Sequence, residues 1–539
     1  MPDAPNQAVP WWTDAVIYQI YPLSYSDSNG DGSGDLQGII DRLDYLSNTL
    51  GVDGIWLSPF YKSPMKDWGY DVSDHTDVDP VFGDLAAAEA LIEAAHAHGL
   101  KVVVDYVMNH TSDQHQWFLD SRSSRDDPKR DWYVWRDGDV SSPPNNWLSV
   151  FGGKAWTFDP TTEQWYRHSF LTEQPDVNWR NPEAVEAMMD VVRFWLDRGV
   201  DGFRVDASHQ IMKDPLERDN PPATAAGSGM HKDMREYDSQ HHLYDVAHED
   251  VHEGHRIFRA VQDSTDRDIL SVGEAHVFDY EEWAAYFGEN LDELTMPFSF
   301  HLLASPWDAE HLADVIRNVI AHTPEGGVTN WTLGNHDEAR LATRLPEGQA
   351  RLAAILLLTL GGASFLYYGD ELGMLQTQIA PGDRRDPWGL AGDDLSRDGA
   401  RTPMQWTSGP SAGFSSPGVD PWLPLGDDYE SVNVETQLAD PDSTLNLYRR
   451  LLETRKTSPV LRFGDVTVGT AEGDVLRYSR SLVGHPSVEV MLNLGRAEQV
   501  VTCEPGSVLV SSHPSTTSNI GPTVTLGVGE GVVVQRHSQ

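Results

Sequence analysis

The sequence has a single cysteine and a shortage of positive charge. Cys503 has no second cysteine with which to form an intrachain disulfide, which is typical of a reducing compartment, so we expect a cytoplasmic protein. The chain carries 39 lysine and arginine residues against 83 aspartate and glutamate residues, a formal net charge of −44. Such a charge repels phosphate backbones and anionic lipid headgroups, and therefore argues against nucleic-acid and membrane partners. A small neutral molecule such as an oligosaccharide is indifferent to it.

Long apolar segments are also lacking. The longest apolar run, Ala353–Tyr368, is interrupted by Thr359 and by glycines, and it is shorter than the roughly 20 residues that a membrane-spanning helix needs. Residues Met1–Pro10 show neither the basic nor the apolar segment of a secretion signal. With 39% hydrophobic residues, the composition is that of an ordinary globular protein, and we expect a monomer or a homodimer.

Short apolar runs bounded by turn residues alternate with helical patterns along most of the chain. The helical patterns have apolar residues three and four positions apart. Eight repeats of strand and helix predict the α/β class and a closed parallel (β/α)8, or TIM, barrel. The predicted strands are Val16–Tyr21, Gly54–Leu57, Lys101–Tyr106, Gly202–Asp206, Leu270–Glu274, Leu294–Phe298, Val328–Thr332 and Ser364–Tyr367. The predicted helices include Leu36–Leu50, Leu85–His98, Pro182–Arg198, Val251–Asp266 and Gln349–Leu360.

Two segments depart from this alternation. Residues 110–181 are too long for a strand-to-helix loop and predict a small inserted domain after strand 3. From residue 459 the pattern changes to alternating runs separated by Gly, Ser and Pro, which predicts a C-terminal antiparallel β-sandwich domain over 459–539. The catalytic barrel then comprises 1–109 and 182–458. We assign the seven tryptophans of the insert mainly to its core, with a sugar-binding surface as the alternative: Trp117, Trp132, Trp135, Trp147, Trp156, Trp165 and Trp179.

The segment Gly202–Asp206 predicts a buried strand with opposite charges on one face. Arg204 and Asp206 are two residues apart, so their side chains point the same way, and the guanidinium lowers the pKa of the carboxyl. An ionised Asp206 suits a nucleophile or an electrostatic stabiliser. A buried ion pair that orients the strand end, or a helix cap, accounts for the same residues, and the segment alone leaves these alternatives open.

Residues 27–35, Asp-Ser-Asn-Gly-Asp-Gly-Ser-Gly-Asp, place oxygen-bearing side chains at alternate positions. The spacing is that of a calcium-binding loop, although Gly38 stands where the helix–loop–helix version has a bidentate glutamate. Three carboxylates this close repel one another without a cation. We therefore expect a structural Ca²⁺ ion, or Mg²⁺, rather than a turn that only caps the next helix. The predicted ligands are Asp27, Asn29, Asp31, the backbone carbonyl of Ser33, and Asp35.

Two further acids, Glu274 and Asp337, follow predicted strands. In TIM barrels such positions share one face, so both should lie near Asp206. Glycoside hydrolysis needs two carboxyl groups in different protonation states, because the leaving oxygen must be protonated while the developing sugar cation is attacked or stabilised. We expect Asp206 to be ionised by Arg204, and Glu274, which has no cation adjacent in sequence, to hold a proton.

Four segments, in order along the predicted barrel, resemble the signature regions of glycoside hydrolase family 13, the α-amylase family. They are Asp105–His110, Gly202–Asp206, Val272–Glu274 and Asn335–Asp337. The resemblance covers essentially the whole chain and is strongest to the oligosaccharide-active α-glucosidases. It implies a catalytic TIM barrel, an inserted domain and a β-rich C-terminal domain.

The resemblance also implies roles for individual residues. Asp206 is implied as the nucleophile, Glu274 as the general acid/base and Asp337 as the transition-state stabiliser. In similar enzymes the aspartate of a Gly-Tyr-Asp turn pairs with an arginine from the strand-8 loop to grip the non-reducing end of the sugar, and here these look like Asp71 and Arg401. The other implied sugar-binding residues are Tyr70, His110, Phe170, Gln174, Arg204 and His336.

Together these features predict a retaining α-glucosidase that removes single glucose units from short, maltose-type α-glucosides through a covalent glucosyl–Asp206 intermediate. Ala207, directly after the nucleophile, is implied to favour α-1,4 over α-1,6 bonds. One alternative is a transglucosylase, or a trehalose-forming or sucrose-isomerising enzyme of the same family, in which an alcohol or sugar outcompetes water. Another is a non-catalytic binding protein, which the three retained acids disfavour.

Overall fold

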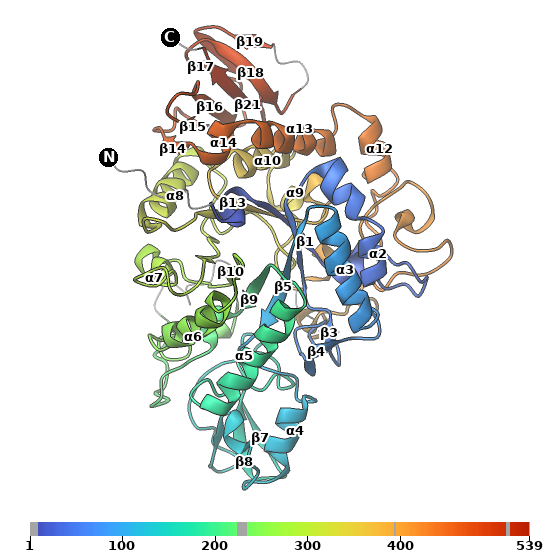
Figure 1. Ribbon diagram of the computed structural model, residues 1–539, viewed down its shortest axis with the longest axis vertical. Helices are drawn as coiled ribbons and strands as arrows, with labels where there is room; N and C mark the ends of the chain where they lie inside the picture. Colours follow the sequence, from blue (N-terminus) through green and yellow to red (C-terminus); the bar gives the residue numbers. More distant parts are fainter. Residues whose placement is uncertain (1–8, 224–233, 393–394, 514–517, 538–539) are drawn as a thin grey trace.

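The computed structural model describes residues 9–223, 234–392, 395–513 and 518–537. Its central sheet has eight parallel strands in the hydrogen-bonded order β11-β10-β9-β5-β2-β1-β13-β12, which confirms the predicted TIM barrel (Figure 1). All eight predicted strands are present, most with small shifts at their ends. They are β1 (Val16–Ile20), β2 (Gly54–Leu57), β5 (Lys101–Val107), β9 (Gly202–Asp206), β10 (Leu270–Gly273), β11 (Met296–Pro297), β12 (Asn330–Thr332) and β13 (Ala363–Tyr367).

A side-chain amide joins β11 and β12, the two strands at the ends of this order. Asn330 Nδ2 donates to the carbonyl of Pro297 at 2.7 Å, and the backbone N–H of Ser299 donates to Asn330 Oδ1 at 2.9 Å. Asn330 is fully buried, so its amide satisfies backbone groups that water cannot reach.

Helices cover the outside of the barrel, and several begin at side-chain caps. Asp84, Asn181 and Asp308 each accept a backbone N–H from the first turn of the following helix. The predicted helix Leu36–Leu50 is divided into α2 and the π-helical turn Tyr45–Leu50. The helices are α1 (Pro22–Tyr25), α2 (Leu36–Ile40), α3 (Leu85–Ala97), α5 (Pro182–Asp197), α6 (Val251–Asp263), α7 (Tyr280–Ala285), α8 (Ala309–His322), α9 (Leu341–Arg344), α10 (Ala350–Thr359), α11 (Pro387–Leu390), α12 (Val434–Ala439) and α13 (Thr444–Thr457).

The segment 110–181 contains helix α4 (Gln116–Ser123) and a three-stranded antiparallel sheet. Of its seven tryptophans, five are buried, and the other two, Trp117 and Trp132, pack partly buried against the core. These side chains therefore serve the core, the first of the two expected roles. The strands of this part are β3 (Tyr61–Lys62) and β4 (Asp74–Val78), which precede the segment, and β6 (Trp135–Arg136), β7 (Trp156–Asp159) and β8 (Gln164–Arg167) within it.

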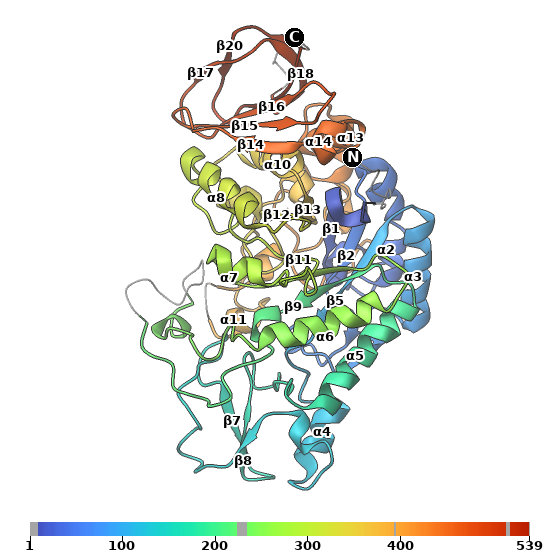
Figure 2. The same cartoon turned by 60° about the vertical axis from the view of Figure 1, so that its left-hand side comes forward.

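The C-terminal part is antiparallel β-structure, as predicted, and begins with α14 (Pro459–Phe463). A six-stranded sheet and the two-stranded sheet β17-β20 enclose a small apolar core that includes Met491 and Leu526. The larger sheet lies beside α13 and α14 (Figure 2). Among the described residues, no helix is both long and apolar enough to cross a bilayer. The strands are β14 (Asp465–Val468), β15 (Val475–Ser481), β16 (Val488–Asn493), β17 (Gln499–Thr502), β18 (Gly506–Ser511), β19 (Asn519–Ile520), β20 (Thr523–Leu526) and β21 (Gly531–Arg536).

Candidate active site

A pocket at the carboxyl ends of the barrel strands gathers most of the predicted site residues. The three acids, which are far apart in sequence, all face it. The predicted residues that line the pocket are Tyr70, His110, Phe170, Asp206, Glu274, His336 and Asp337. Four others, Asp71, Gln174, Arg204 and Arg401, are buried behind this lining.

Arg204 lies beneath the pocket and binds three carboxylates. Its Nη1 lies 2.8 Å from Asp206 Oδ1 and 2.9 Å from Asp105 Oδ1, and its Nη2 lies 2.5 Å from Glu274 Oε2. The strand register explains this arrangement. Arg204 on β9 is paired with Val272 on β10, so Glu274, two residues further on, extends over the same face. One guanidinium therefore holds both predicted catalytic carboxyls side by side.

This contact shows that the expectation for Glu274 was wrong. The sequence indicated no adjacent cation, because Arg204 is 70 residues away along the chain. Burial opposes ionisation of Glu274, yet the Arg204 guanidinium and a hydrogen bond from His276 hold the pKa of Glu274 below its ordinary value. Burial raises the pKa of Asp206 well above its ordinary value, although Arg204 opposes this shift. Arg204 and His276 thus favour the ionised form of Glu274, whereas burial favours the protonated form of Asp206.

Asp337 faces the pocket from the loop after β12 and is held by two arginines. Its Oδ1 accepts hydrogen bonds from Arg397 Nη1 at 3.0 Å and from Arg401 Nη2 at 2.9 Å. Its Oδ2 lies 3.3 Å from His336 Nε2. Two fixed positive charges thus anchor this acid at the pocket wall.

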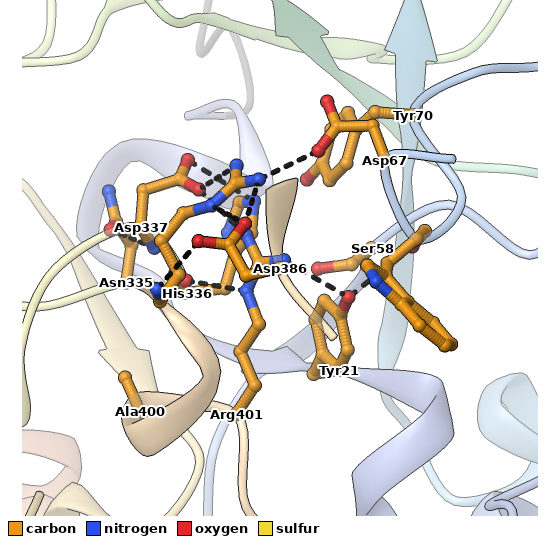
Figure 3. Close-up of polar contacts among 12 residues, drawn as sticks. Tyr21, Ser58, Asp67, Tyr70, Asn335, His336, Asp337, Asp386, Ala400 and Arg401 are labelled. Carbon is orange, nitrogen blue, oxygen red and sulfur yellow. Dashed lines mark hydrogen bonds and ion pairs between the residues drawn. The ribbon is translucent and has the colours of Figure 1, made fainter. Parts of the chain in front are cut away.

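Arg397 connects Asp337 to a further acid, Asp67. Arg397 Nη2 lies 2.7 Å from Asp67 Oδ1 and 2.5 Å from Asp386 Oδ1. Figure 3 shows Asp67, Asp337 and Asp386 converging on one place from separate segments of the chain. Asp67 and Arg397 both line the pocket, so their ion pair forms part of its wall.

The expected ion pair between Asp71 and Arg401 is therefore wrong. The pair that forms is Asp67 with Arg397, each four residues earlier in the sequence than the expected partner. Asp71 accepts backbone N–H groups from Lys66 and Asp67 at 2.8 and 2.9 Å. The reason is a tight turn in which Trp68 and Gly69 have φ of 50° and 111°. This turn brings Asp67 to the pocket and leaves Asp71 to close the turn from behind.

Two neutral histidines and two aromatic rings complete the predicted sugar site. Burial lowers the pKa of His110 to about 4 and that of His336 to about 3. His336 is stacked on Tyr70 with ring centroids 5.2 Å apart, and Phe170 lies 5.1 Å from His110. Gln174 Nε2 lies 3.1 Å from His110 Nε2, so Gln174 supports the lining from behind.

The predicted metal loop is a hydrogen-bonded turn that leads into α2. Asp27 accepts backbone N–H groups from Asn29 at 3.1 Å and from Gly32 at 2.8 Å. Asp35 caps α2 by accepting the N–H of Gly38 at 2.6 Å, so the helix cap that was the alternative is present. Within the described ranges, no group of three or more His, Cys, Asp or Glu side chains is arranged to hold a metal ion. Calcium binding by this loop stays a prediction.

Sequence reasoning missed several lining residues. Asp67 and Asp71 both flank the Trp-Gly-Tyr turn, and Arg397 and Arg401 both flank Asp-Gly-Ala, so each segment offered two candidates. His276 stands two residues after Glu274 and is therefore a candidate for the same face. The missed lining residues discussed below are Asp67, Tyr237, His276, Phe300 and Arg397.

Comparisons with known proteins agree with this architecture. The α-amylase catalytic-domain family matches residues 19–464. A probable α-glucosidase of Rhizobium meliloti (strain 1021) is 43% identical over 509 residues, covering 92% of this chain and 91% of that protein. The oligo-1,6-glucosidase of Parageobacillus thermoglucosidasius is 36% identical over 534 residues, covering 91% of each. The solved structure of the α-glucosyl transfer enzyme XgtA is 40% identical with a TM-score of 0.91, covering 98% of this chain and 100% of that one.

Proposed function

Because this chain belongs to the α-amylase family of glycoside hydrolases and is a glycosidase, we propose that it is a retaining, exo-acting α-glucosidase. The observation that carries this proposal is the contact of Asp206 and Glu274 with one guanidinium, that of Arg204. Such closeness favours the carboxyl separation of about 5–5.5 Å found in retaining enzymes over the about 6.5–9.5 Å of inverting ones.

In the first step Asp206 attacks the anomeric carbon while Glu274 gives its proton to the departing oxygen. The glycosidic bond breaks and a covalent glucosyl–Asp206 forms. Glu274 must therefore hold the proton once a glucoside is bound. The sugar favours this exchange, because positive charge developing at the anomeric carbon stabilises the ionised Asp206 and the glycosidic oxygen accepts a hydrogen bond from Glu274.

In the second step Glu274 removes a proton from water, which attacks the anomeric carbon and releases glucose and the Asp206 carboxylate. Asp337, anchored by its two arginines, accepts hydrogen bonds from sugar hydroxyls that strengthen as the ring flattens. The neutral His110 and His336 donate to or accept from the same sugar, and Tyr70 offers it an aromatic wall.

The Asp67–Arg397 pair supports an exo mode of action. A salt bridge that closes one end of the pocket leaves room for a terminal glucose and grips its hydroxyls. Ala207 supports the α-1,4 preference, because its backbone N–H donates to Glu274 Oε2 at 3.1 Å and its side chain is small. The single cysteine favours a reducing compartment, and we place the enzyme in the cytoplasm.

A second candidate function is transfer of the glucosyl group to an acceptor other than water. Several apolar side chains line the pocket, and a solved relative is named as an α-glucosyl transfer enzyme. An apolar wall binds the carbon skeleton of an acceptor alcohol better than it binds water. The apolar lining includes Val150, Phe151, Met234, Tyr237, Val246, Phe300 and Leu303.

A product profile over maltose, isomaltose, sucrose, trehalose and starch, with and without an added alcohol, tests these functions. We expect the glucose cleaved from the non-reducing end of maltose to be released as the α-anomer, little action on starch, and no interconversion of sucrose or trehalose. Asp206→Asn should abolish turnover while circular dichroism and the Tm show a folded protein. Near-normal hydrolysis by that variant would contradict the assigned role of Asp206, and transfer products as the main outcome would favour the second function.

A further inference from the structure

Glu274 uses its two carboxyl oxygens differently. Oε2 is occupied by Arg204 Nη2 at 2.5 Å and by the backbone N–H of Ala207 at 3.1 Å. Oε1 lies 3.0 Å from His276 Nε2. Since Oε2 is directed at Arg204, Oε1 is the oxygen that can serve a glycosidic bond, and it is the one that His276 contacts.

His276 is itself fixed on the pocket wall, in the loop after β10. Its ring is stacked on Phe300 with centroids 4.9 Å apart and an interplanar angle of 20°. It also meets the ring of His209 at 5.7 Å in an edge-on arrangement. The His276 side chain is 18% exposed, and both neighbours line the pocket with it. The ring is therefore oriented before any sugar arrives.

We propose that His276 is a positioning residue that fixes the reactive oxygen of Glu274 through both of its protonation states. The inference rests on the proposed role of Glu274 as general acid/base. When Glu274 is protonated, its Oε1–H is left to donate to the glycosidic oxygen, and an Nε2–H of His276 donates to the remaining lone pair of Oε1. When Glu274 is ionised, an Nε2–H donates to Oε1. The same imidazole N–H therefore holds Oε1 in both states, and a side-chain amide can supply an equivalent donor.

The other ionisable groups around Glu274 leave the holding of Oε1 to His276. Arg204 faces Glu274 from β9 and is charged throughout, while the acids Asp206, Asp105 and Asp337 face the same site. His209, on the adjacent segment, is kept neutral because burial lowers its pKa to about 3. Removing His276 takes a donor away from the ionised form of Glu274, so the pKa of Glu274 should rise.

His276→Leu and His276→Gln, assayed on maltose and on p-nitrophenyl α-glucoside, test the proposal. For His276→Leu we expect kcat/KM on maltose to fall about tenfold, but on the aryl glucoside less than about threefold, because p-nitrophenolate leaves with little protonation. The alkaline limb of the maltose profile should move up by about one pH unit. His276→Gln, whose amide still donates, should retain most of the activity. His301→Gln is the matched control, since His301 is a buried, ring-stacked histidine outside the pocket lining.

The same substitution in a Glu274→Ala background separates positioning from other effects. If His276 acts through Glu274, adding His276→Leu should cause no further loss of aryl glucoside turnover. An additional loss in that background, or equal losses on both substrates with an unchanged pH profile, would overturn the proposal. If His276→Leu behaves like the wild type while Asp206→Asn is inactive, only the inference about His276 is contradicted. If Asp206→Asn is active, the proposed function itself is contradicted.

Discussion

Replacing Asp67 with asparagine tests whether the Asp67–Arg397 pair closes the pocket. Both side chains are buried, 6% and 7% exposed, and the substitution removes one charge-assisted hydrogen bond of about 1.5–3 kcal/mol. Arg397 keeps its contacts with Asp386 and Asp337, so no buried charge is left unpaired and the fold should hold. If the pair grips the terminal glucose, kcat/KM for maltose should fall by about tenfold to about 150-fold, measured as initial rates of glucose release.

Asp71→Asn is the matched control. Asp71 accepts two backbone N–H groups and the Ser63 hydroxyl inside the turn, so its loss should lower the Tm while kcat/KM per folded molecule stays within about threefold. The reasoning fails if Asp71→Asn loses as much activity as Asp67→Asn. It fails equally if Asp67→Asn hydrolyses maltose at the wild-type rate.

Three further predictions concern stability, metal and linkage preference. Burial raises the pKa of Asp370 to about 7, so the wild type should lose at most about 4 kcal/mol of unfolding free energy as pH rises from about 4 to about 7. Calorimetry should show the stability advantage of Asp370→Asn growing over that window, and a constant difference contradicts this. If the loop at Asp27 binds Ca²⁺, EDTA should lower the Tm and Ca²⁺ should restore it, whereas an unchanged Tm means that hydrogen bonds alone hold the loop. Ala207 has φ of 43°, so Ala207→Val should lower the free energy of unfolding in urea by about 1–2 kcal/mol. The same substitution should raise the ratio of isomaltose to maltose hydrolysis rates, and an unchanged ratio refutes the role of Ala207 in linkage preference.

The sequence was sufficient for the barrel because local rules decide it. Each strand is a short apolar run between turn residues, and each of the helices α3, α5 and α8 starts at a capping side chain. The three acids could be predicted to meet because each ends or follows a strand, and the carboxyl ends of barrel strands share one face.

The remaining errors come from contacts that the register and the loops decide. Arg204 reaches Glu274 only because β9 and β10 pair in a particular register, which no local pattern encodes. The choice between Asp67 and Asp71 depends on the positive φ of Trp68 and Gly69, and long loops have no periodicity from which to infer which side chain faces inward.

The side-chain amide of Asn330 has a consequence for local opening of the barrel. On one side, β12 pairs with β13 through main-chain hydrogen bonds. On the other side it is linked to β11 by the side chain of Asn330, and this contact can break without disrupting a ladder of main-chain hydrogen bonds. We expect deuterium to enter the amides of β12 sooner than those of β9, which has ladders on both sides. Asp337 follows β12, and its hydrogen bonds with Arg397 and Arg401 then hold this acid in place while β12 opens.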